Sequence, residues 1–184
     1  MRVERFSIPG PVLFYPKLWG DSRGFFLESF KASVFEKEGV PREFLQDNHS
    51  RSARAVVRGL HLQAPPHEQG KLVRVTKGKA FDVAVDIRKG SSTYGKWVGV
   101  LLTEEEQNIF WVPPGFAHGF SVLEDGTDFL YKVTKEYSVA HEMGIRFDDP
   151  DLNIDWKIEK GKELVAEKDR KMPFLKDFQS PFVF

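Results

Sequence analysis

The chain has 184 residues, with 27 lysines and arginines, 27 aspartates and glutamates, and no cysteine. This length predicts a single domain over residues 1–184 with a core of its own, and the zero net charge excludes a protein-wide field that would attract nucleic acid or an anionic membrane. The lack of cysteine excludes disulfides and thiolate metal sites, and because no segment resembles a signal peptide or the ~20 apolar residues of a membrane span, we expect a cytoplasmic protein.

Short segments in which apolar and polar residues alternate run along most of the chain, and many are aromatic. Such alternation favours strands, and many short strands separated by Gly, Pro, Ser and Asp predict a mainly β fold, a sandwich or barrel. One helix is expected at 31–38, ended by Gly39, and a turn or two of helix is expected shortly before Pro173. The predicted strands are 25–30, 44–50, 56–63, 71–77, 80–88, 97–102, 108–113, 118–123 and 128–134.

Several of these strands carry side chains that are unusual for a packed sheet. Residues two apart share a face, so Lys71 lies on the same face as two valines, and Tyr131 on the same face as a phenylalanine and a valine. His61 and Arg58 are three apart and fall on opposite faces of a regular strand. Both can point into one cavity only if the backbone bulges, and Gly59 is the residue that permits a bulge.

Each of these side chains also has an ordinary explanation. A lone histidine in a strand is most often a core or rim residue, a lysine can lay its apolar stem on a sheet, and a tyrosine can simply pack. Together, however, one candidate base, two cations and a phenol occupy three strands of one predicted barrel. Barrel interiors commonly bind ligands, so the combination predicts a ligand site.

A metal site is the first alternative, because many β-barrels of the cupin type bind a metal through a His-x-His pair. Here that position reads His61-Leu62-Gln63, so the second imidazole is missing. His118 follows in a later strand, and His67 lies among turn residues. Two histidines without a placed carboxylate make a poor site for a transition metal, so we predict no metal and no other cofactor.

The motifs, taken in order, resemble those of the dTDP-4-dehydrorhamnose 3,5-epimerase family from about residue 3 to about residue 175. The matching segments are DSRGFFLESF (21–30), QDNHSRS (46–52), VVRGLHLQ (56–63), QGKLVRVTKGKAFDVAVDIRKGSSTYGKW (69–97), WVPPGFAHGF (111–120), YKVTKEYSVAHE (131–142) and DDPDLNIDW (148–156). The resemblance implies a double-stranded β-helix, the cupin jelly roll, with a few short helices. It also implies a homodimeric, metal-independent isomerase of dTDP-rhamnose biosynthesis. Its substrate would be a dTDP-4-keto-6-deoxy sugar, dTDP-4-dehydro-6-deoxy-D-glucose, inverted at carbons 3 and 5 to give dTDP-4-dehydro-L-rhamnose.

The resemblance also implies roles for individual residues. His61 would accept the proton and Tyr131 would donate one. Lys71, with Arg58 nearby, would stabilise charge on the ketone oxygen, and Asp169 would orient His61. The residues expected to bind the substrate are Arg23, Phe26, Glu28, Gln46, Asn48, Arg58, Lys71, His118, Glu142 and Lys168. Within this group, the phenylalanine is expected to contact thymine, across the dimer, and the two glutamates to pair with ligand donors or a neighbouring arginine.

Elementary chemistry explains these residue types. A proton beside a ketone is weakly acidic, so its removal needs a base together with stabilisation of the enolate oxygen, and inversion needs a donor on the opposite face. Because the protein is neutral overall, the diphosphate must be met by local cations. Two alternatives stay open: a single-carbon epimerase or 3,4-ketoisomerase on the same fold, and a non-catalytic nucleotide-sugar-binding cupin. The aromatic segment after 173 is expected to pack on its own barrel or on a partner subunit.

Overall fold

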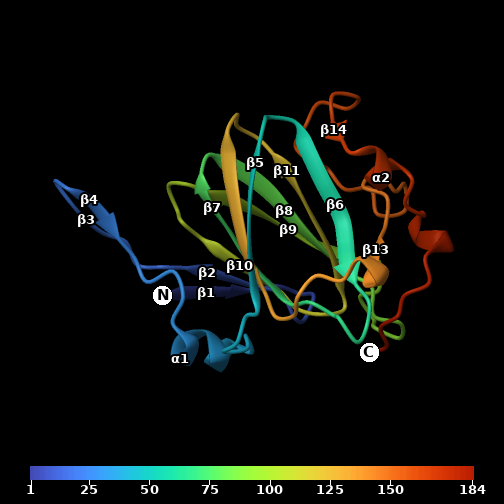
Figure 1. Cartoon of the computed structure of the whole chain (residues 1–184), viewed down its shortest axis with the longest axis horizontal. Helices are drawn as coiled ribbons and strands as arrows, with labels where there is room; N and C mark the ends of the chain where they lie inside the picture. Colours follow the sequence, from blue (N-terminus) through green and yellow to red (C-terminus); the bar gives the residue numbers. More distant parts are fainter.

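Two sheets lie face to face and form the body of the molecule (Figure 1). The computed structural model describes all residues, 1–184. The first sheet contains, in spatial order, β1 (Arg2–Arg5), β2 (Val12–Tyr15), β10 (Ile109–Val112), β7 (Lys71–Lys77), β12 (Thr127–Val133) and β5 (Gln46–Ser52). The second contains β13 (Glu142–Gly144), β6 (Val56–Gln63), β11 (Phe116–Val122), β8 (Lys79–Asp86) and β9 (Trp97–Thr103), with β14 (Leu164–Val165) pairing β6.

Neighbours in these sheets are mostly distant in sequence, as in a jelly roll. Strand β10 lies between β2 and β7, and β11 lies between β6 and β8, in antiparallel pairing throughout. The mainly β, cupin-like barrel with a few short helices is therefore confirmed. Because residues from the first strand to the C-terminal tail pack on the same two sheets, we propose that residues 1–184 form one domain.

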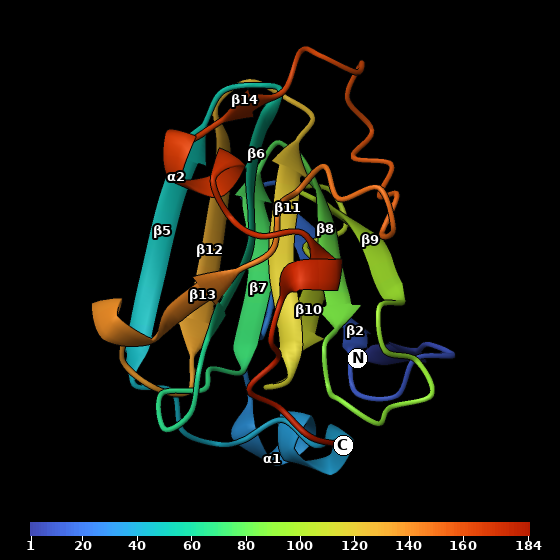
Figure 2. The same ribbon diagram turned by 90° about the vertical axis from the view of Figure 1, so that its right-hand side faces the viewer.

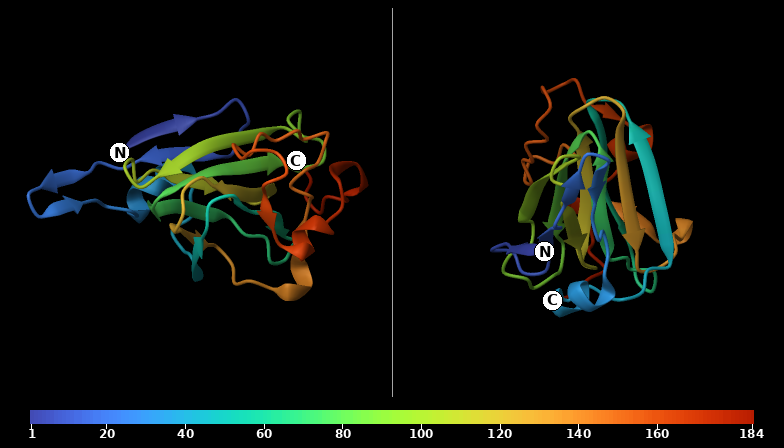
Figure 3. Two further views of the ribbon diagram at one scale, coloured as in Figure 1. Left: turned by 90° about the horizontal axis from the view of Figure 1, so that it is seen from above. Right: turned by 90° about the vertical axis from the view of Figure 1, so that its left-hand side faces the viewer.

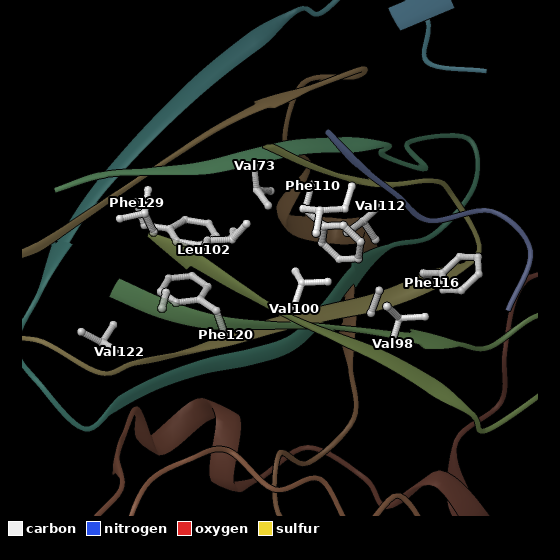
Figure 4. Close-up of a cluster of buried hydrophobic side chains, with 14 of the residues drawn as sticks. Val73, Val98, Val100, Leu102, Phe110, Val112, Phe116, Phe120, Val122 and Phe129 are labelled. Atoms are coloured by element: carbon white, nitrogen blue, oxygen red, sulfur yellow. The ribbon is translucent and has the colours of Figure 1, made fainter. Parts of the chain in front are cut away.

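The main core fills the space between the sheets, and Figure 4 shows its side chains between the two layers of strands. In β7, Val73 and Val75 point into this core, whereas Leu72 packs on the outer face, as the alternation predicted. Phe120 from β11 and Phe129 from β12 stack across the sheets, with ring centroids 3.8 Å apart and planes within 4°. This pair closes one end of the apolar core, because Phe120 also lines the polar cavity described below.

The outer faces of the two sheets are covered by different parts of the chain. Residues after 144 cross the second sheet (Figure 2), where Phe147, Trp156 and Phe178 form a buried cluster with the strands. The aromatic tail thus packs on its own barrel, which is one of the two alternatives expected from the sequence. On the first sheet, Phe35 of α1 (Ala32–Phe35) packs on Phe14 with ring centroids 4.4 Å apart.

The predicted helices are present and short. A 3-10 turn, η1 (Glu36–Glu38), follows α1 and ends at Gly39, whose φ of 86° is left-handed as expected for a helix end. Before Pro173 the chain forms α2 (Glu167–Arg170), and two further 3-10 turns are η2 (Val139–His141) and η3 (Leu175–Asp177). None of these helices has the length and apolar character needed to cross a membrane.

A two-stranded hairpin, β3 (Trp19–Asp21) and β4 (Gly24–Phe26), projects away from the two sheets (Figures 1 and 3). Its aromatic residues face solvent: Phe25 is 58% and Phe26 65% exposed. The prediction of a strand over 25–30 is wrong for residues 27–30, because only residues up to 26 pair with a neighbouring strand. Beyond it, the chain turns toward α1, which buries the later apolar residues against the first sheet.

Candidate active site

A cavity of about 720 Å³ lies between the two sheets and the C-terminal segment. Strands of both sheets contribute to its wall, and residues 163–170 close one side. All four predicted catalytic residues line it, together with four further residues predicted to bind substrate: Arg58, His61, Lys71, His118, Tyr131, Glu142, Lys168 and Asp169. The sequence-based expectation that these side chains share one cavity is therefore confirmed.

An irregularity in β6 brings Arg58 and His61 to the same cavity. His61 lies opposite His118 of β11, whereas Arg58 lies opposite Phe120, so three steps along β6 match two along β11. Gly59 sits at this shift with a φ of 125°, and a Cβ there would lie 2.6 Å from the Cα of the facing glycine. No side chain fits, which explains the glycine and confirms the predicted bulge.

His61 is held by a carboxylate from the C-terminal segment. Its Nε2 lies 2.8 Å from Oδ1 of Asp169, whose Oδ2 accepts the backbone N–H of Gly59 at 3.3 Å. Burial alone would raise the pKa of Asp169, but the hydrogen bonds from His61 and Gly59 outweigh it and the pKa is lowered. An ionised carboxylate only accepts hydrogen bonds, so Nε2 of neutral His61 carries the hydrogen and Nδ1 is left as the basic nitrogen.

Lys71 is a buried cation beside this histidine. It is only 8% exposed, and its Nζ donates to the backbone carbonyl of His61 at 3.3 Å. Burial lowers the pKa of Lys71 to about 8, while the negative charges of Asp82 and Glu142 act in the opposite direction. The ammonium form therefore predominates at neutral pH, and two of its three N–H groups are not used by the protein.

Tyr131 supplies the phenol of the site and packs against the barrel core. Its ring packs against the main core cluster, 6.2 Å from the ring of Phe129. Burial raises the pKa of Tyr131, and the charges of Arg58 and Lys168 oppose the rise only in part. The hydroxyl is therefore protonated at neutral pH and can act as a proton donor.

The mouth of the cavity has hydrogen-bonded polar walls. Lys168 Nζ donates to Glu142 at 2.7 Å, and the Tyr137 hydroxyl donates to the same carboxylate at 2.9 Å. Glu142 thus pairs with a lysine and a tyrosine and not with a neighbouring arginine, while its other expected partners, donor groups of the ligand, stay a prediction. Gln46 donates to Asn48 at 2.8 Å and accepts the backbone N–H of Tyr137. Both amides line an adjoining hollow of about 220 Å³ that shares His61, Lys71 and Tyr131 with the main cavity.

Three predicted binding residues lie outside the cavity of their own chain. The Arg23 side chain is 88% exposed on the hairpin and pairs with Asp21 at 2.5 Å. Phe26 is exposed on the same hairpin, and Glu28 pairs with Lys31 at 3.1 Å. A single copy of the chain does not bring these three residues to His61.

Some residues of the site carried no role in the sequence prediction. Tyr137 lies within a quoted motif, yet nothing in its spacing separates it from an ordinary surface tyrosine. Asp82 could have been found, because the alternation in its strand places it with Ala80 and Ala84 on the interior face. It is fully buried and bonded by His118. No group of three or more His, Cys, Asp or Glu side chains is arranged to hold a metal ion.

Known proteins resemble this chain along most of its length. A family model described as dTDP-4-dehydrorhamnose 3,5-epimerase matches residues 5–177. The dTDP-4-dehydrorhamnose 3,5-epimerase of Shigella flexneri is 52% identical over 171 residues, which covers 92% of this chain and 93% of that relative.

Solved structures show the same likeness. The crystal structure of a dTDP-6-deoxy-D-glucose-3,5-epimerase from Legionella pneumophila, in complex with dTDP-4-keto-L-rhamnose, is 45% identical with a TM-score of 0.92 and covers 97% of this chain and 94% of that one. A more distant structure, a 3'-monoepimerase from Streptomyces bikiniensis in complex with dTDP-quinovose, is 31% identical with a TM-score of 0.87 and covers 93% and 86%.

Proposed function

The chain belongs to the dTDP-4-dehydrorhamnose 3,5-epimerase family, and from this we propose that it is an isomerase that converts dTDP-4-dehydro-6-deoxy-D-glucose to dTDP-4-dehydro-L-rhamnose by inverting carbons 3 and 5. The observation that carries the proposal is the convergence of a carboxylate-bound imidazole, a buried ammonium and a protonated phenol on one cavity. This is the set of groups that proton removal beside a ketone, followed by return of a proton, requires.

In the proposed first step, His61 takes a proton from a carbon beside the ketone. Asp169 stabilises the imidazolium that forms, and the Lys71 ammonium stabilises the enolate oxygen. A positioned base contributes about 10²- to 10⁴-fold to such a step, and a donor at the developing oxyanion about 10²- to 10³-fold. Both effects gain from the buried site, where the effective dielectric is lower than in water.

In the second step, the Tyr131 hydroxyl donates its proton to the same carbon from the opposite face. The C–H bond lost to His61 is thus replaced by one from the phenol, and the carbon is inverted. His61 then releases its proton to solvent and the phenolate regains one, so that the enzyme returns to its starting state. Each inverted carbon therefore carries a hydrogen that came from solvent.

Turnover in deuterium oxide tests this proposal. Incubation with dTDP-4-dehydro-6-deoxy-D-glucose should label carbons 3 and 5. Label at one carbon would instead indicate a single-carbon epimerase, an alternative that the likeness to a 3'-monoepimerase supports. Absence of label, with dTDP still bound, would indicate a nucleotide-sugar-binding protein and contradict the catalytic proposal.

We also propose that the enzyme is a homodimer in which the β3–β4 hairpin of each subunit reaches the cavity of its partner. The exposed aromatic rings of the hairpin support this, because exposed apolar surface of this kind is typical of a contact. Arg23 would then add a cation for the diphosphate to Arg58 and Lys168 of the other subunit. A cytoplasmic location stays a prediction, supported by the absence of cysteine.

A further inference from the structure

Asp82 is a fully buried carboxylate on the interior face of β8. Both of its oxygens contact Nε2 of His118, at 2.9 and 3.0 Å, and its hydrogen bonds come from this one ring. An ionised carboxylate in a protein interior is costly unless an opposite charge lies nearby. Asp82 lies inside the barrel behind His118, which lines the cavity, and a charge buried there requires a cation nearby.

His118 is not that cation. Its side chain is 7% exposed, and burial lowers the pKa of His118 more than Asp82 raises it, so the ring is neutral. Because the carboxylate accepts, the hydrogen of the neutral ring is on Nε2. His118 thus fixes the carboxylate by a hydrogen bond without neutralising its charge.

Lys71 is the buried cation that remains. Its hydrogen bond goes to the carbonyl of His61 and not to Asp82, so the two opposite charges do not form a direct salt bridge. We propose that Asp82 is a positioning residue for the reaction: held by His118, it supplies the counter-charge that keeps Lys71 an ammonium while leaving the N–H groups of that ammonium available to the ketone oxygen. This inference rests on the proposed function.

The charges around Lys71 agree with this role. Burial lowers the pKa of Lys71 to about 8, and Asp82 is the strongest of the groups that raise it, ahead of Glu142. Besides His118, the other titratable and charged groups at the cavity are Arg58, His61, Tyr131, Tyr137, Lys168, Arg170, Glu163 and Asp169. Of the carboxylates, Asp169 is hydrogen-bonded to His61 and Glu142 to Lys168. Asp82 is therefore the fully buried carboxylate among the two that act on Lys71, and the one that no cation pairs directly.

The variant Asp82→Asn tests the inference, because the amide keeps the shape and can still accept from His118 while the charge is lost. With the charge gone, the pKa of Lys71 should fall by about one unit, so the alkaline limb of the kcat–pH profile moves to lower pH and activity near pH 8 drops about fivefold. Activity at pH 6.5 should stay near that of the parent protein. Acetylation of Lys71 by acetic anhydride, followed by mass spectrometry across pH, should show the same downward shift.

The matched control is Asp86→Asn, a buried carboxylate on the same strand that binds Arg88, Ser91 and Thr93. It should lower thermal stability without moving the alkaline limb of the kcat–pH profile or the pH dependence of Lys71 acetylation. Asp82→Glu, which keeps the charge, should have an alkaline limb of the kcat–pH profile close to that of the parent protein.

Equal loss of activity at every pH in Asp82→Asn, with an unchanged acetylation curve for Lys71, would overturn the inference. The inference would also be overturned if, in the parent protein, acetylation of Lys71 had the pH dependence of an ordinary exposed lysine. This measurement requires no variant to fold. Since acetylation needs no turnover, it is independent of the substrate. Failure of the proposed function would appear separately, as absence of deuterium in the product of the parent protein.

Discussion

His61 Nε2 and Asp169 Oδ1 lie 2.8 Å apart, although 108 residues separate them in the chain. The contact depends on β14, which pairs in parallel with the start of β6 through Leu164 opposite Val56 and so returns the chain to the strand that carries the histidine. Two residues later α2 begins, and it presents Asp169 to the cavity. The orientation of the proposed base is therefore set by the C-terminal segment, and not by the sheet alone.

The variant Asp169→Asn should lower kcat by about 10²- to 10⁴-fold, because the amide can donate to Nε2 of His61 and stabilise the tautomer whose Nδ1 carries the hydrogen. Binding of dTDP, measured by calorimetry, should change little. The control is Asp155→Asn, an exposed carboxylate paired with Lys157, which should leave kcat unaltered. A kcat within twofold of the parent in Asp169→Asn would show that this carboxylate does not orient the base.

The variant Tyr131→Phe separates deprotonation from inversion. Without the phenol, His61 should still remove the substrate proton and return solvent deuterium to the same face, while product formation falls by about 10²-fold or more. Mass spectrometry of recovered substrate and chiral analysis of product measure the two rates. Tyr94→Phe is the matched control, since Tyr94 packs on the outer face of the second sheet. Normal product at the parent rate would assign the donor to another group.

Many strands of the fold could be predicted, because the alternation of apolar and polar residues indicates which face of a strand is buried. Strands β6 and β7 begin and end at the predicted residues, and Lys71 lies on the same face as the core valines as expected. The shift at Gly59 was also predictable, since Arg58 and His61 can share a cavity only if the regular alternation is broken. In both cases the information is local to one strand.

The parts that sequence did not predict depend on contacts between distant segments. Strand β14 has two residues, too few for any alternation to show, and β1 is a short edge strand in which three of the four residues are charged. The bond between Asp82 and His118 joins residues 36 apart on neighbouring strands, a register that only the folded sheet reveals. The lysine partner of Glu142 was likewise not predictable, because it comes from α2.

The variant Gly59→Ala should disrupt the site through the backbone. A Cβ at this position would lie 2.6 Å from Gly119 Cα and 2.8 Å from the His118 carbonyl oxygen, and both are main-chain atoms that cannot move aside. We expect a loss of unfolding free energy of about 2 kcal/mol or more and a lower kcat. Urea denaturation measures the first.

The control for this variant is Gly161→Ala. Gly161 also has a positive φ, 88°, but no atom lies within 4 Å of the added Cβ. Its loss of stability should be about 1 kcal/mol, from backbone strain alone, with kcat unchanged. Equal losses in both variants would show that the close approach of β6 to β11 is not what requires a glycine.

Mixing two inactive variants tests whether the hairpin serves the partner subunit. Arg23→Ala impairs the hairpin and leaves its own cavity intact, whereas His61→Ala inactivates the cavity and leaves its hairpin intact. If the hairpin acts across the dimer, a mixed dimer has one complete site, and random exchange of equal amounts should restore about a quarter of the parent activity. If each hairpin instead served its own cavity, no site in the mixture would be complete and activity would not rise above that of the separate variants. Two preparations of His61→Ala, exchanged in the same way, give the baseline.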